Sequence, residues 1–294
     1  MFRTMLGIGL LVCATTAFAG EKETNKDNPG QGNPDGVHQR KDTGKPGGAQ
    51  TIQYHGGPVM LGTVNAYAIY YGNWSGSSMA ILNNLLSHIG GTPYFNINTT
   101  YYDGQNRHVS GAVSLAGAYL TGAYLGNSLS DLQIQQIVSD AISANHLPKD
   151  SNGVYFVLTW SDVTAKSGFC TQYCGWHTHG TISGSDIKYA FIGNPARCPS
   201  ACTNGTKSPN NDVGADGAAS IIAHELEEAV TDPDLNAWFD RQGAENADKC
   251  AWTFGTTYTT ANGGVANMNI GGMDFLIQRN WLNAGTGSCA QQYP

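Results

Sequence analysis

The strongest constraint on the fold is the regular alternation of strand-like and helix-like segments along one stretch of chain. Patterns rich in aromatic and β-branched residues predict strands at 58–72, 153–160 and 187–195. Apolar residues at helical spacing predict helices at 77–91, 128–148 and 218–231. Because strands and helices alternate without interruption, we predict a single three-layer α/β domain with a mixed sheet.

Three further segments have weaker patterns. The stretch PYFNINTTYY at 93–102 predicts another strand, because aromatic and polar residues alternate along it. The echo AGAYL–TGAYL at 116–125 is too short for a repeat architecture and is interpreted as hairpin material. A Cys- and Gly-rich loop is expected between the strands at 153–160 and 187–195.

The first 53 residues are predicted to lie outside the domain. Residues 1–19 carry a basic residue, an apolar run and a small-residue cleavage site, which is typical of a secretory signal peptide. Residues 20–53 contain almost no large apolar side chain, so we expect a disordered linker or pro-segment. The domain would then span 54–294, and the protein would be secreted, with no transmembrane segment.

Charge and cysteine content exclude some classes of function and suggest the redox compartment. The net charge of −7 argues against nucleic acid as a partner. Six cysteines follow the signal peptide, and in an exported chain this even number predicts three disulfides, with 15 possible connectivities. A pair between Cys250 and Cys289 would staple the C-terminal region. The two C-x-x-x-C motifs at 170–174 and 198–202 offer thiolate zinc binding as the alternative.

The candidate site lies in the helical segment AASIIAHELEEAVTDPD at 218–234. His224 and Glu228 stand four residues apart, about 40° around the helix, so that one ion can contact both side chains. Glu225 projects about 100° from His224, a position suited to holding a metal-bound water. A solvated acidic helix face with a lone histidine is the competing interpretation of the same residues.

A third metal ligand must come from another segment, and AENADKC at 244–250 offers Glu245 or Asp248. Zinc accepts carboxylate oxygen as well as imidazole nitrogen, so Glu228 does not abolish a zinc site. A set this rich in carboxylates also suits calcium or manganese. We therefore expect zinc, with calcium as the alternative.

Other residues offer weaker candidates. His177 and His179 in CGWHTH share one face if the segment is a strand, where they would suit a metal or an oxyanion, but an exposed loop beside a disulfide is the simpler interpretation. The aromatic residues at 67–74 and 101–102 suit either a sugar-stacking surface or packing between strands.

Several long motifs resemble the Exordium, or phosphate-induced protein, family. These are NNDVGADGAASIIAHELEEAVTDPDLNAW with Glu245–Cys250 and GGMDFLIQRNW, the pair FCTQYCGWH and NPARCPSAC, and GPVMLGTVNAYAIYYGNWS. The resemblance runs from about Gly57 to the end of the chain. It implies an extracellular, wall-associated protein, and plant members have no agreed biochemical activity. The HELEE segment is also similar to the active-site helix of zincin metallopeptidases, which implies a zincin-like domain.

Two functional hypotheses follow from different classes. The first is a secreted zinc peptidase acting on a peptide or cell-wall substrate. In it His224, Glu228 and either Asp248 or Glu245 bind the metal, and Glu225 is the general base for the metal-bound water. The second is a non-catalytic extracellular Exordium-like protein that binds glycan or a protein partner. An open coordination position facing a cleft would favour the first, and an enclosed site the second.

Overall fold

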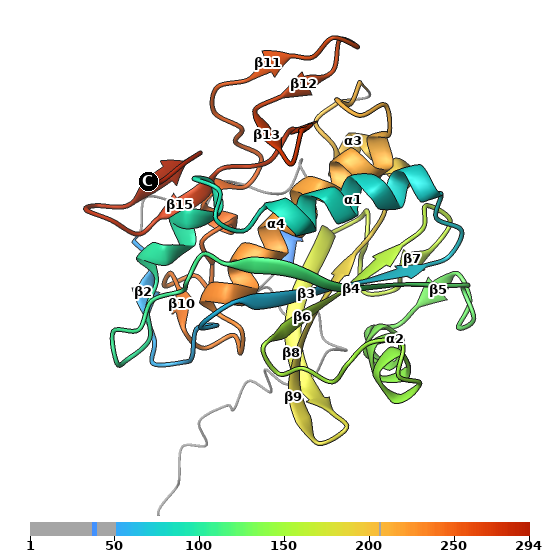
Figure 1. Ribbon diagram of the computed structural model, residues 1–294, viewed down its shortest axis with the longest axis horizontal. Helices are drawn as coiled ribbons and strands as arrows, with labels where there is room; N and C mark the ends of the chain where they lie inside the picture. Colours follow the sequence, from blue (N-terminus) through green and yellow to red (C-terminus); the bar gives the residue numbers. More distant parts are fainter. Residues whose placement is uncertain (1–36, 40–50, 206) are drawn as a thin grey trace, which may run out of the picture.

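The computed structural model describes residues 37–39, 51–205 and 207–294 and places a mixed six-stranded sheet at the centre (Figure 1). The strand order across this sheet is β1-β8-β9-β6-β3-β4. Their bounds are Val37–Gln39 for β1, Val64–Tyr71 for β3, Val113–Thr121 for β4, Gly153–Thr159 for β6, Tyr173–Ile182 for β8 and Ser185–Ile192 for β9. Strands β4, β3, β6 and β9 are parallel to one another, β8 pairs antiparallel with β9, and the edge strand β1 pairs antiparallel with β8.

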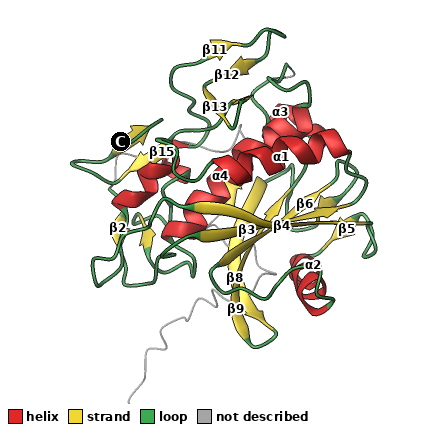
Figure 2. Cartoon of the chain, in the orientation of Figure 1, coloured by secondary structure: helices red, strands yellow, loops and turns green. Residues whose placement is uncertain are grey.

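Helices cover both faces of the sheet, as Figure 2 shows. Helices α1 (Gly76–His88) and α4 (Val213–Thr231) pack on one face, and α2 (Asp131–Ser143) packs on the other. Shorter helical turns are α3 (Pro199–Cys202), η1 (Phe95–Thr100), η2 (Pro195–Arg197) and η3 (Asp248–Cys250). This arrangement confirms the predicted α/β class with a mixed sheet.

Small two-stranded sheets surround this frame. They pair β2 (Gln53–Tyr54) with β10 (Trp238–Phe239), β5 (Ser128–Leu129) with β7 (Thr164–Ala165), β11 (Tyr258–Thr259) with β12 (Val265–Ala266), β13 (Met268–Ile270) with β14 (Met273–Phe275), and β15 (Asn280–Leu282) with β16 (Ser288–Ala290). Three of these five sheets lie in the C-terminal 60 residues, where runs of apolar residues at helical or strand spacing are short.

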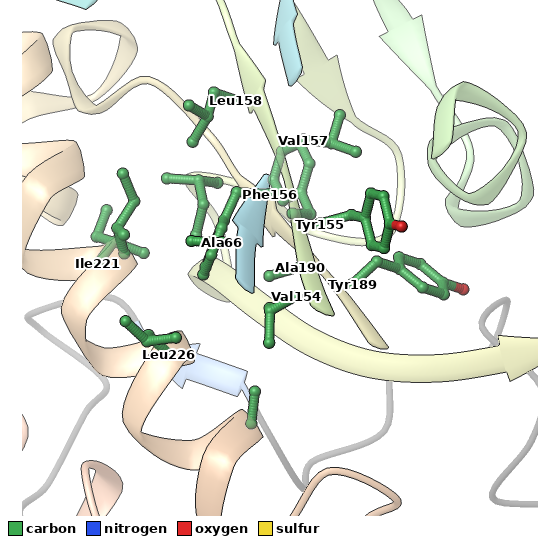
Figure 3. Close-up of a cluster of buried hydrophobic side chains, with 14 of the residues drawn as sticks. Ala66, Val154, Tyr155, Phe156, Val157, Leu158, Tyr189, Ala190, Ile221 and Leu226 are labelled. Atoms are coloured by element: carbon green, nitrogen blue, oxygen red, sulfur yellow. The ribbon is translucent and has the colours of Figure 1, made fainter. Parts of the chain in front are cut away.

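The core lies between α4 and the central strands. Strand β6 is buried along its whole length because helices cover both of its faces, which explains its unbroken apolar run. In Figure 3, Ile221 and Leu226 of α4 face Ala66 and Phe156, while Tyr155 and Tyr189 point to the opposite side of the sheet. The aromatic residues that were expected either to stack on sugars or to pack between strands are mostly buried. The buried ones are Tyr67, Tyr70, Tyr71, Trp74 and Tyr101.

Local sequence signals explain α1 and α2, the two long helices that precede α4 in the chain. Helix α2 begins with a complete capping box, in which Ser130 and Gln133 satisfy each other's backbone N–H groups. Helix α1 begins after the capping residue Ser75, whose hydroxyl accepts a hydrogen bond from the backbone N–H of Ser78 at 3.1 Å. Both helices therefore lie largely in the segments predicted as helical, 77–91 and 128–148, and both are shorter than predicted.

The structure corrects three of the expected elements. Residues 95–100 form the 3-10 helix η1 rather than a strand, because Thr92, Thr99 and Thr100 bond to backbone groups three residues away. The echo at 116–125 is not a hairpin: its first half belongs to the parallel edge strand β4. The expected loop after β6 contains the ten-residue strand β8, which pairs with β9.

Strand β1 lies within the segment 20–53 that was expected to be a linker or pro-segment. Its backbone pairs with the outer edge of β8, where His38 lies opposite Gly175. An edge strand offers unpaired N–H and C=O groups, and β1 satisfies those of β8. The predicted signal peptide lies outside the described residues.

Three disulfides staple the domain, as predicted. They join Cys170 to Cys198, Cys174 to Cys202, and Cys250 to Cys289. The first two connect the two C-x-x-x-C motifs to each other, so the thiolate-zinc alternative is wrong for these cysteines. In the part of the chain that the structure describes, no helix has the length and apolar character needed to cross a membrane.

Candidate metal centre

Helix α4 carries the HELEE motif and is buried along almost its whole length. It begins after Asp212, whose side chain accepts a hydrogen bond from the backbone N–H of Ala215 at 2.9 Å. It ends at Thr231, because Pro233 disfavours helical backbone in the residue before it. Charged residues are rarely fully buried without partners. The burial of this motif therefore excludes the solvated acidic face that was the competing interpretation.

His224 and Glu228 face each other across one helical turn. The distance from His224 Nε2 to Glu228 Oε1 is 2.9 Å, and both side chains are 0% exposed. The spacing of four residues places them side by side, as helix geometry requires. A single ion can thus contact both.

The segment from Asp240 to Cys250 returns two carboxylates to this helix. Asp248 Oδ1 lies 3.5 Å from His224 Nε2, and the backbone N–H of Asp248 donates to Glu228 Oε1 at 3.2 Å. Glu245 lies elsewhere, with its Oε2 atom 3.1 Å from Nε2 of His177. The sequence offered Glu245 and Asp248 as alternatives for one position, but the structure places them beside different histidines.

His177 belongs to the same centre, and sequence reasoning did not place it there. It lies in the buried half of β8, and its Nε2 atom is 3.7 Å from Glu228 Oε2. The simpler interpretation of CGWHTH as an exposed loop is wrong. The aromatic and β-branched residues around this motif were the signal that could have identified a strand. We call His177, His224, Glu228, Glu245 and Asp248 the central cluster.

His179 lies two residues further along the same face of β8, in a separate and more exposed group. Its Nδ1 atom is 2.8 Å from Asp186 Oδ1 and 3.8 Å from Asp234 Oδ1. The ammonium group of Lys188 contacts both carboxylates. A cation already balances these acids, so this group is a surface ion-pair network and a weak candidate for a metal.

The two histidines of the central cluster differ in electrostatic environment. Burial lowers the pKa of His177 to about 4, although Glu228 acts in the opposite direction. Burial also acts to lower the pKa of His224, but Glu228, Asp248 and Glu225 together raise it well above its usual value. Burial raises the pKa of Glu228, and Asp248 adds to that effect. His177 is therefore neutral at neutral pH, whereas His224 must release a proton to bind a metal.

Glu225 is fully buried between α4 and β8. A Cβ atom at Gly175 would lie 2.9 Å from Glu225 Oε1 and 2.6 Å from Ile221 Cγ2. Glycine at this position of β8 therefore permits the close approach of helix and strand, as glycine within a strand often does. Glu225 is held tightly against the strand that carries His177.

The spacing of the cluster fits a divalent cation. Two ligands about 2.1 Å from a tetrahedral zinc ion lie roughly 3.4 Å apart. The measured separations between histidine nitrogens and carboxylate oxygens run from 2.9 Å for His224 and Glu228 to 3.7 Å for His177 and Glu228. The donor set is also right for zinc, since it combines imidazole nitrogen with carboxylate oxygen.

These features define a disulfide-stapled α/β domain with an enclosed histidine–carboxylate cluster, and sequence comparison shows its family. Residues 52–278 match the family described as phosphate-induced protein 1 conserved region. The chain is 32% identical to Protein EXORDIUM-like 3 of Arabidopsis thaliana over 270 residues, which cover 78% of this chain and 80% of that relative. The chain therefore belongs to the Exordium, or phosphate-induced protein, family.

Two other relatives agree with this assignment. Protein PHOSPHATE-INDUCED 1 of Nicotiana tabacum is 30% identical over 229 residues, covering 67% of this chain and 69% of that relative. Protein EXORDIUM of Arabidopsis thaliana is 28% identical over 236 residues, covering 69% and 72%. No solved structure matches the chain. The comparisons thus confirm the Exordium resemblance and give no support to the zincin-like one.

Family membership corrects the first functional hypothesis. Exordium and phosphate-induced proteins are not known as hydrolases, so the expectation of a secreted zinc peptidase is wrong. The motif misled because a histidine and a glutamate four residues apart suit any cation site, structural or catalytic. Exordium proteins are generally extracellular, and the three disulfides are compatible with that location.

Proposed function

We propose that this chain is a non-catalytic extracellular Exordium-like protein whose central cluster holds a structural divalent cation. The observation that carries the proposal is the enclosure of the cluster. Four of its side chains are at most 1% exposed, namely those of His177, His224, Glu228 and Glu245. The side chain of Asp248 is 13% exposed. A catalytic zinc site keeps one position open to water and substrate, whereas a structural site is closed.

The cation would join three separate parts of the chain. His177 belongs to β8, His224 and Glu228 to α4, and Glu245 and Asp248 to the segment that follows. Each carboxylate buried without a compensating charge would destabilise the fold. A bound divalent ion removes this repulsion and ties the sheet edge, the helix and the C-terminal region together.

The two histidines favour zinc over calcium. Calcium binds through oxygen ligands, often six to eight of them, and imidazole is a poor ligand for it. Zinc accepts both donors of the cluster. We therefore propose zinc as the ion, with Glu225 as a buried neighbouring carboxylate rather than as a general base.

A groove in the C-terminal region suggests glycan as the binding partner. Its volume is about 610 Å³, and it is lined by Tyr94, Tyr258 and several side-chain amides, among them Asn267, Asn269 and Gln291. Tyr258 is 43% exposed. Amides donate and accept hydrogen bonds with sugar hydroxyls, and an exposed aromatic ring offers a stacking face. This chemistry fits a neutral polysaccharide better than a charged partner.

The non-catalytic part of the proposal predicts that the metal-loaded protein does not cleave peptide bonds. We expect an unstructured protein such as casein to stay intact, with no difference between the wild type and Glu225→Gln. Removal of a true general base costs about 10²–10⁴ in rate. Cleavage by the wild type that falls by such a factor in the variant would contradict the proposal. Gel analysis of casein over a day of incubation is sufficient.

The binding part predicts slower migration of the protein in native gels that contain a neutral wall polysaccharide. Tyr258→Ala should weaken this retardation, because the variant loses the exposed aromatic face of the groove on which a sugar ring would stack. Tyr124→Ala serves as the matched control, since Tyr124 is also exposed but lies near α2. Equal retardation of the two variants would exclude the groove as the binding site.

A further inference from the structure

The central cluster divides into two overlapping groups that share one residue. His224, Glu228 and Asp248 bring ligand atoms within 4.8 Å of one another, and so do His177, Glu228 and Glu245. Each group has its own histidine and its own second carboxylate. Only Glu228 belongs to both, at the centre of the cluster.

The two oxygens of Glu228 face different histidines. Its Oε1 atom lies 2.9 Å from Nε2 of His224, and its Oε2 atom lies 3.7 Å from Nε2 of His177. A carboxylate that presents one oxygen to each of two ligand groups can bridge two metal ions. Ions in dinuclear sites of proteins lie roughly 3.5–4 Å apart.

We propose that the central cluster binds two divalent cations, one in each group, with Glu228 as the bridging ligand. This inference rests on the proposed function, in that the cluster must first be a cation site. The first ion contacts His224, Glu228 and Asp248. The second contacts His177, Glu228 and Glu245, and it makes His177 and Glu245 ligands rather than neighbours.

Unpartnered buried atoms support the second ion independently. Among the described residues, Oε2 of Glu228 makes no hydrogen bond, although the side chain is 0% exposed. This atom faces the group around His177, where the second ion would lie. An orphaned buried carboxylate oxygen is costly, so a native structure that contains one calls for an explanation such as a bound ion.

The charge of the centre also fits two ions better than one. The ligands Glu228, Glu245 and Asp248 carry three carboxylates, and the buried Glu225 adds a fourth. One divalent ion carries only half the charge of these four carboxylates, and mutual repulsion among buried carboxylates is costly. Two divalent ions balance all four carboxylates when both histidines are neutral.

Metal content of purified variants tests this proposal with zinc as the probe. The full chain is dialysed against a small excess of Zn²⁺, freed of unbound metal and measured by elemental analysis. We expect about two ions per chain in the wild type, about one in His177→Ala and about one in His224→Ala. His179→Ala is the matched control on the same face of β8 and should keep both ions.

The outcomes distinguish the two proposals. One ion per wild-type chain that survives His177→Ala would overturn the dinuclear site and leave a single structural cation. No ion in the wild type would overturn both. Loss of one ion in His179→Ala would also overturn the inference, because the second ion would then belong to the His179 group. If the His177 variant fails to fold, electron paramagnetic resonance of wild-type protein loaded with Mn²⁺ decides, since a bridged pair gives a spin-coupled spectrum and a single ion does not.

Discussion

Removal of the proposed zinc ions with a chelator is expected to lower the melting temperature of this protein by about 8–16 °C. A ligand present at 1,000 times its dissociation constant stabilises the folded state by about 4 kcal/mol. In a domain of 150–250 residues, each kcal/mol shifts the melting temperature by about 2–4 °C. Differential scanning calorimetry before and after dialysis against a chelator measures the change.

The physical reason for this large effect is the burial of the ligands. Without a cation, the carboxylates and histidines of the central cluster still lie close together in a centre that excludes water. The carboxylates must then take up protons or repel each other, and either process costs free energy. Return of Zn²⁺ should restore the original melting temperature if no other part of the molecule has changed.

Two variants show whether the effect belongs to the central cluster. His224→Ala should melt at a lower temperature than the wild type and should respond less to the chelator, because the variant keeps about one of the two ions. His179→Ala should remain as sensitive to the chelator as the wild type. An unchanged melting temperature of the wild type after complete removal of metal would contradict a structural role for the ion.

The sequence predicted the parts of the site that depend on local spacing. His224 and Glu228 are neighbours because a helix returns to the same side after four residues, and α4 has both a cap and an apolar stripe. The acidic residues of 244–250 were close enough in sequence to be expected nearby. Which of them contacts His224 depends on how the turn at Asp248 folds, and spacing alone carries no such information.

His177 shows the limit of this reasoning. It comes from a strand 47 residues before His224 and reaches the cluster because α4 packs against β8 on one face of the sheet. Only the strand order, in which β8 pairs antiparallel with β9, brings it there. Such long-range pairing leaves no periodic signal in the residues themselves.

The error at residues 93–102 has a related cause. Phe95 and Ile97 alternate with polar residues as in a strand, and both are buried. Besides the local threonine bonds, long-range contacts hold this segment in η1, because the buried Asn98 accepts hydrogen bonds from the amides of Asn246 and Asn280. These partners lie about 150 and 180 residues away along the chain. Tertiary contacts thus overrode a local pattern that favoured a strand.

Asp240→Asn is expected to destabilise the protein by about 3–5 kcal/mol, because it removes the carboxylate charge that is paired with a buried ammonium group. Lys249 Nζ lies 2.7 Å from Asp240 Oδ2, and both side chains are 0% exposed. Asp240 also accepts hydrogen bonds from the backbone N–H groups of Gln242 and Ala244. An asparagine oxygen can keep these two bonds, so the variant removes mainly the charge. Urea denaturation at neutral pH measures the loss.

The pH dependence and a double variant make this prediction specific. Burial acts to raise the pKa of Asp240, but the hydrogen bond from Lys249 and the two backbone donors outweigh it and hold the pKa below its usual value of 3.8. The stabilisation is therefore present above pH 3.8 and is lost as the pH falls through the lower folded-state value. The difference between wild type and Asp240→Asn should shrink in that range.

Adding Lys249→Met should recover much of the loss at neutral pH, because a buried ion pair can be replaced by apolar packing. If the double variant is as unstable as Asp240→Asn alone, the unpaired ammonium is not the cause, and the loop from Asp240 to Ala244 depends on the carboxylate itself.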